Sequence, residues 1–97
     1  MPTCVRLLKF TAKGAELIKG GPGRLQDAKK RAKQQGGEIK AYYLTMGQYH
    51  AVVIVEAPND EVAVAGSMSA AQLGFIRTET MRVFTEDEYK KLVSTLP

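Results

Sequence analysis

Residues 38–56, which read EIKAYYLTMGQYHAVVIVE, constrain the fold of this chain more than any other stretch. Its two halves, residues 39–46 and 49–56, are rich in Val, Ile and Tyr, which favour β-strands. Gly47-Gln48 lies between them and suits a tight turn with glycine at its first central position. The pattern therefore predicts a β-hairpin, and the rest of the chain has to supply its neighbours.

The predicted hairpin has no polar face. Pairing across the turn places Leu44 opposite Ala51 on one face. Tyr43 and Val52 then lie opposite each other on the other face. A sheet with one face in water alternates between apolar and polar residues, whereas residues 52–55 read Val-Val-Ile-Val. We therefore expect helices on one face and a second subunit on the other.

The segment before the hairpin predicts a strand and two helices. Residues 4–10 have a strand pattern, and Thr11 can cap a short helix that extends to residue 18. The sequence Gly-Gly-Pro-Gly at residues 20–23 is interpreted as a linker, because it lacks the lysine and hydroxyl of a P-loop. The second helix is predicted over residues 24–35 and ends at a glycine pair.

The segment after the hairpin predicts a helix, a strand and a last helix. Asn59 and the acids after it are a helix start, and the helix over residues 60–73 carries its predicted apolar side on Val62, Ala65, Met68 and Leu73. Residues 75–84 form the fourth strand pattern, and a capping box at residues 85–88 opens the last helix. The order predicts an α+β fold, a ferredoxin-like β-α-β-β-α-β sandwich with an added C-terminal helix.

Length and composition predict one domain over residues 1–97. No apolar stretch reaches the roughly 18 residues of a membrane span, and no leader precedes the first strand, so we expect a cytoplasmic protein without a membrane partner. The net charge of +4 is concentrated in one predicted helix, at Arg24, Lys29, Lys30, Arg31 and Lys33. No aromatic residues interleave these cations for base stacking, which favours a solvated helix face over a nucleic-acid partner.

Three short sequences carry a family resemblance: MGQYHAV at residues 46–52, EAPNDE at 56–61 and RTET at 77–80. They resemble the GYD domain family of small bacterial and archaeal proteins, and the likeness covers nearly the whole chain. Gly47 and Tyr49 match the residues for which the family is named, whereas His50 stands where its aspartate is expected. The resemblance implies a ferredoxin-like fold that pairs as a dimeric α/β barrel, related to the ligand-binding domains of leucine-responsive transcription regulators.

Polar side chains within the predicted strands are the candidate ligand-binding residues, because a barrel of two sheets encloses space between them. The candidates are Arg6, Tyr43, Tyr49, His50, Arg77, Thr78 and Thr80. Glu79 can instead pair with Arg77 on the surface. Arg6 is either inert at a sheet edge or turned into an interior where its charge needs an anion.

The sequence contains no recognisable catalytic constellation. His50 is the sole histidine and the one candidate for a general base, and a metal site is not expected because zinc needs three or four ligands. No cofactor is predicted. The leading interpretation is a homodimeric module that binds a small molecule, with an anionic metabolite as one option. The alternative is a small monooxygenase-like enzyme of the dimeric α/β barrel type that uses His50.

Overall fold

The computed structural model describes all 97 residues, Met1–Pro97, and confirms the predicted order of elements. The elements are β1 (Thr3–Phe10), α1 (Ala12–Glu16), the 3-10 turn η1 (Ile18–Gly20), α2 (Gly21–Gln34), β2 (Glu38–Leu44), β3 (Ala51–Glu56), α3 (Asp60–Gln72), β4 (Ile76–Val83) and α4 (Glu86–Ser94). The four strands form one antiparallel sheet in the order β2-β3-β1-β4. This is the α+β, ferredoxin-like fold with an added C-terminal helix.

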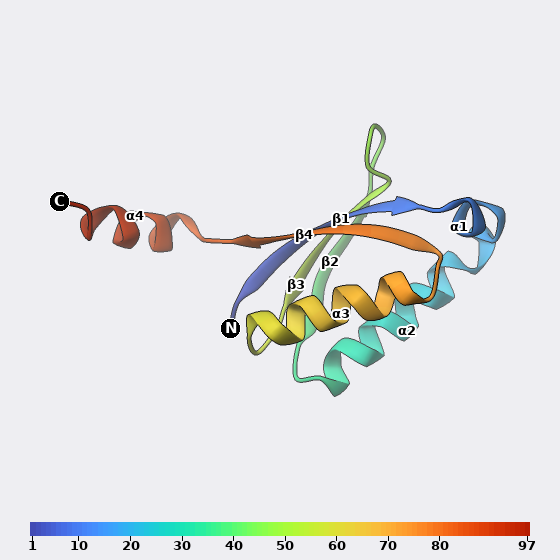
Figure 1. Ribbon diagram of the computed structural model, residues 1–97, viewed down its shortest axis with the longest axis horizontal. Helices are drawn as coiled ribbons and strands as arrows, with labels where there is room; N and C mark the ends of the chain where they lie inside the picture. Colours follow the sequence, from blue (N-terminus) through green and yellow to red (C-terminus); the bar gives the residue numbers. More distant parts are fainter.

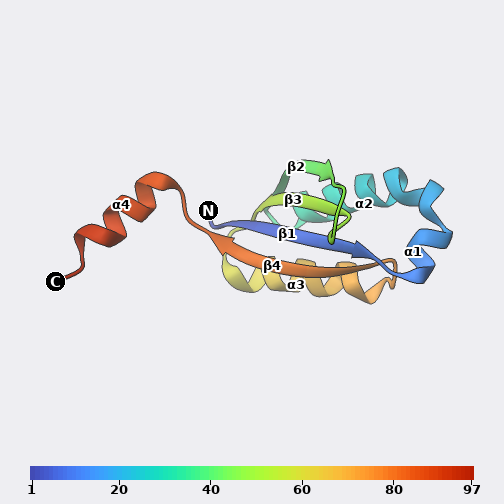
Figure 2. The same ribbon diagram turned by 90° about the horizontal axis from the view of Figure 1, so that it is seen from above.

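The sheet has one covered face and one uncovered face (Figures 1 and 2). Helices α2 and α3 lie side by side on the same face, α2 over β2 and β3 and α3 over β4. We call this the helix face and the opposite one the open face. Helix α4 covers neither, because it runs away from the sheet beyond the end of β4 (Figure 1).

The buried core lies on the helix face. One cluster combines Leu8 of β1 with Ala51, Val53 and Val55 of β3, and a second combines Cys4, Ala57 and Ala63. These side chains alternate along their strands with residues of the open face, as the period of two requires. The core therefore uses only one side of a sheet whose strands are apolar on both sides.

The hairpin of β2 and β3 has the predicted register, with Leu44 opposite Ala51 and Tyr43 opposite Val52. The register shifts between Ile39 and Ala41, so Lys40 forms a β-bulge that keeps Ile39 opposite Val55 on the helix face. β2 ends at Leu44 and β3 begins at Ala51, so the paired strands are shorter than expected. The connection over residues 45–50 is correspondingly longer and projects beyond the sheet (Figure 1).

The sequence predicts a linker at residues 20–23, but this prediction is wrong. The segment belongs to helical structure. It completes η1 and opens α2, which begins at Gly21 and not at Arg24. Pro22 is accommodated because the first turn of a helix needs no intrahelical N–H donor.

Helix α3 packs only partly with the side that its sequence predicts: Val62 packs against the cluster of Cys4, Ala57 and Ala63, whereas Ala65 is exposed. Met68, expected in the apolar stripe, is 67% exposed, and Ala63 is the only buried residue of the helix. The small residues Gly66 and Ser67 face the sheet instead. The reason is the side chain of Arg6, which rises from β1: a Cβ atom on Gly66 would lie 2.9 Å from Arg6 Nη2.

Candidate ligand-binding site

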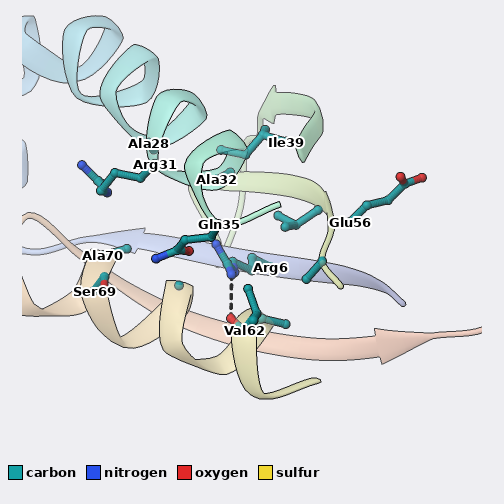
Figure 3. Close-up of a pocket in the computed structure, with 14 residues that line it drawn as sticks. Arg6, Ala28, Arg31, Ala32, Gln35, Ile39, Glu56, Val62, Ser69 and Ala70 are labelled. Carbon is teal, nitrogen blue, oxygen red and sulfur yellow. Dashed lines mark hydrogen bonds between the residues drawn. The ribbon is translucent and has the colours of Figure 1, made fainter. Parts of the chain in front are cut away.

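Arg6 lies in the middle of the sheet and points between the two helices. It belongs to β1, a central strand, where it is opposite Val53 on β3 and Thr80 on β4. Its Nη2 donates a hydrogen bond of 2.8 Å to the carbonyl oxygen of Ala63 on α3 (Figure 3). The sequence leaves two positions open for Arg6, at a sheet edge or turned into the interior. In the structure its side chain is turned into the interior.

The guanidinium of Arg6 has no counter-ion. The two ion pairs of the chain, Lys40 with Glu38 and Arg82 with Asp60, do not involve it, and its buried Nε has no hydrogen-bond acceptor. Burial lowers the pKa of Arg6 from its ordinary value, because removal from water disfavours the cation. Arginine nevertheless stays protonated in proteins, so a partly desolvated positive charge is left without a negative partner.

Two cavities border Arg6 and share part of their lining. The smaller holds about 50 Å³, enough for ordered water or a small charged group, and lies between α2, α3 and the sheet (Figure 3). The larger holds about 560 Å³, within the range of small-molecule sites. Residues that line both include Arg6, Ala28, Arg31, Ile39 and Ala70.

The larger cavity is apolar with a cationic rim. Leu8, Val53, Phe75 and Ile76 are among its apolar lining residues. Three arginines line it, Arg6, Arg24 and Arg31, against the single acid Asp27. The arrangement suits a molecule with an apolar body and a negatively charged end.

One of these arginines is already held in place. The guanidinium of Arg24 lies 4.1 Å from the centre of the Phe75 ring, and its Nη2 donates a hydrogen bond of 2.8 Å to the Leu17 carbonyl. Arg6 therefore differs from Arg24 in having polar atoms that remain to be satisfied.

Thr78 and Thr80 lie on the helix face with Arg6, where both contact the same serine. Ser67 Oγ on α3 is 2.8 Å from Thr78 Oγ1 and 2.8 Å from Thr80 Oγ1. Thr78 also lines the larger cavity, but Thr80 does not. The Ser67 hydroxyl bonds to both threonines, and only Thr78 of the pair borders the larger cavity.

The other predicted site residues lie elsewhere. Tyr43 and Arg77 are on the open face, where they pair with Val52 and Lys9. Tyr49 donates a hydrogen bond of 2.8 Å to a carboxylate oxygen of Glu79, and this bond raises the pKa of Tyr49. None of these side chains lines either cavity next to Arg6.

His50 is engaged at the edge of the sheet. Its Nδ1 accepts a hydrogen bond of 2.8 Å from the backbone N–H of Phe10, and its ring stacks on the Phe10 ring with centroids 5.0 Å apart. The neutral ring therefore carries its proton on Nε2. No carboxylate orients the imidazole, and His50 does not line the cavity, although Phe10 does.

The structure contains neither a metal-binding cluster nor a membrane-spanning helix. No group of three or more His, Cys, Asp and Glu side chains comes together in a way that could hold a metal ion. None of the helices combines the length and apolar character needed to cross a bilayer.

Sequence reasoning missed the contribution of α2 and of Ile39 to the site. Together with residues of the sheet, the larger cavity is lined by seven residues of α2, none of them buried: Gly21, Pro22, Arg24, Leu25, Asp27, Ala28 and Arg31. Two signals were present: an arginine within an apolar strand, and glycine and serine where α3 passes over it. They indicate where Arg6 points only when β1 and α3 are known to be in contact.

The sheet, the helix layer and the cavity between them define an α+β domain of the ferredoxin-like class. The model of the GYD domain matches residues 4–93, and the chain belongs to this family. The chain is 28% identical over 82 residues to a protein of Thermus thermophilus named glutamine synthetase and cystathionine beta-lyase binding protein. The match covers 84% of this chain and 86% of that protein. No solved structure matches the chain significantly.

Proposed function

We propose that this chain is a homodimeric binding module that holds a small anionic molecule beneath α2. Arg6 is the counter-ion, and the larger cavity receives the apolar body of the ligand. The observation that carries the proposal is the desolvated guanidinium of Arg6, which has no carboxylate partner and borders about 560 Å³ of mostly apolar space. A carboxylate suits it best, because the planar guanidinium can donate two parallel hydrogen bonds to one carboxylate.

The homodimer is supported by the open face. Val5, Leu7, Val52 and Ile54 lie there on the two central strands, with Tyr43 and Met81 beside them at 62% and 46% exposure. A contiguous apolar patch of this kind is a typical interaction surface. Two copies can cover it by packing face to face.

A second candidate function, binding to another protein, is favoured by a separate observation. The relative from Thermus thermophilus is named as a binding protein for two enzymes, and the match covers most of both chains. The open face and α4 offer apolar surface for a protein partner. The two functions are compatible, because the cavity lies on the helix face. The monooxygenase-like alternative gains no support from the way in which His50 is engaged.

The ligand proposal is tested with matched pairs of carboxylates and neutral amides. Octanoate with octanamide and phenylacetate with phenylacetamide differ mainly in charge. A carboxylate at ~100 times its dissociation constant adds about 2.7 kcal/mol to the free energy of unfolding. This raises Tm by roughly 10 °C or more for a domain of this size. Equal stabilisation by the amide would contradict the role of Arg6.

Two variants locate the site. In Arg6→Met the carboxylate is expected to give no rise in Tm, because the cation is gone. In Gly66→Ala the new Cβ would lie 2.9 Å from Arg6 Nη2, so the guanidinium has to move and binding weakens. Gly23→Ala is the matched control, since its Cβ meets nothing within 4 Å. If the carboxylate still raises the Tm of Arg6→Met, the proposed site is wrong.

A further inference from the structure

Helix α4 is an amphipathic helix whose apolar side is exposed. Tyr89, Leu92 and Val93 of the helix and Leu96 just beyond its end follow the spacing i, i+3, i+4, i+7 and are between 46% and 67% exposed. No residue of the helix is buried. The helix leaves the sheet at the end of β4 and extends away from α2 and α3 (Figure 2).

An unsupported helix of this length is not stable in water. Helices shorter than about 12 residues are marginal on their own, and α4 has nine, even with its complete capping box. The radius of gyration is 14.8 Å, against about 12.5 Å for a typical folded chain of this length. The principal extents of 52 × 31 × 19 Å reflect the projection of α4 beyond the sheet, and we call α4 the arm. The apolar side of α4 therefore needs a surface that its own chain does not place against it.

We propose that α4 packs on a second copy of this chain and completes the dimer interface. The inference rests on the homodimer of the proposed function. A stable interface buries about 800 Å² of accessible surface on each partner. The open face supplies part of this area, and an exchanged α4 adds its exposed apolar side to the contact.

Two cations on the open face form the expected contact site for α4 of the second copy. Lys9 and Arg77 lie opposite each other across β1 and β4 on the open face, and neither belongs to an ion pair, although Lys9 Nζ lies 5.3 Å from the centre of the Tyr49 ring. Like charges directly opposite in a sheet repel each other. The neighbouring acid on this face, Glu79, forms no ion pair with them and accepts a hydrogen bond from Tyr49. The first turn of α4 carries three acids, Glu86, Asp87 and Glu88.

The acids of α4 cannot reach these cations within one chain while β4 and α4 keep their present course. Lys9 and Arg77 are at one end of the β1 and β4 pair, whereas Thr3 and Val83 are at the other, about 20 Å away along the strand. Two sheets that pack face to face with antiparallel strands bring the Val83 end of one copy over the Arg77 end of the other. The acidic turn of each α4 then lies beside the two cations of the partner, and twofold symmetry satisfies both arms at once.

The first test removes the apolar side of the arm in the full chain. Sedimentation equilibrium is expected to show that Leu92→Glu with Leu96→Glu weakens the dimer at least 100-fold. The control places the same charges on Val64 and Met68 of α3, which are 53% and 67% exposed, and is expected to change Kd less than threefold. The inference is overturned if the α4 variant associates as tightly as the unmodified chain.

The second test exchanges the charges. Lys9→Glu with Arg77→Glu, and separately Glu86→Lys with Asp87→Lys, are each expected to weaken the dimer about tenfold. Both exchanges together are expected to return Kd to within threefold of the unmodified chain. Losses that simply add in the combined variant would overturn the placement of the arm.

One further variant separates this inference from the proposed dimer. If Val52→Glu on the open face abolishes the dimer while the α4 variants do not, the sheet interface stands and the exchanged arm is wrong. If the unmodified chain is a monomer at all concentrations, both the exchange of α4 and the proposed homodimer are wrong. The rise in Tm with octanoate is measured in the same samples and reports on the cavity independently.

Discussion

Both faces of the sheet carry apolar side chains but differ in what covers them. On the helix face, Val53 and Val55 are 4% exposed and belong to the core. On the open face, their neighbours Val52 and Ile54 are only half-buried, and no helix of the chain lies over them. The charged groups differ too, since Arg6 alone is enclosed between helices and sheet. One face is therefore completed within the chain, and the other needs a partner.

The sharpest contrast comes from the same substitution on adjacent residues. Val53→Glu places an unpaired carboxylate in the core and is expected to reduce the free energy of unfolding by about 4 kcal/mol or more. Val52→Glu is expected to leave a folded monomer, because its side chain is on the open face. Urea unfolding with sedimentation distinguishes the two. A folded Val53→Glu dimer would invert the assignment of the faces.

Removal of the half-buried Arg6 cation is expected to stabilise the free protein. Arg6→Met replaces a desolvated charge with a flexible apolar side chain, and unfolding in urea is expected to require about 1 to 2 kcal/mol more. Arg6→Lys keeps the charge and serves as the control, with no gain expected. If Arg6→Met is clearly destabilised, the guanidinium contributes more to the fold than to a site.

The hydroxyls beneath α3 are expected to contribute less. Ser67→Ala removes the shared partner of Thr78 and Thr80 and is expected to cost about 1 kcal/mol, the typical net value of such hydrogen bonds. Ser69→Ala on the same helix, which makes no such bond to the sheet, is the control. Thermal unfolding of both variants measures the difference.

The smallest expected effect is a pH dependence at the start of α4. The backbone N–H of Thr85 donates to the Glu88 carboxylate, and this bond lowers the pKa of Glu88. A carboxylate whose folded pKa is lowered stabilises the fold above its unfolded pKa of about 4.3, and this stabilisation is lost as pH falls through the lower folded value. The Thr85 amide resonance should follow this titration. A Glu88→Gln variant that titrates identically would exclude this assignment.

The sequence by itself determined the local structure, because its causes are local. Alternation of side chains defined the strands and the hairpin register, Thr85 and Glu88 marked the capping box, and Gly36 with φ of 83° ended α2. Where such signals were ambiguous the predictions failed. The glycines at residues 20–23 read as a linker although Pro22 is equally suited to a first helical turn.

Only the tertiary structure decided the direction of Arg6 and the packed side of α3. Each depends on the other, since the small residues at Gly66 and Ser67 make room for an arginine 60 positions earlier in the chain. Periodicity describes how one element repeats and does not specify which element it meets. The cavity beside Arg6, the uncovered face and the projecting α4 all depend on tertiary contacts, which are set by packing between residues distant in sequence.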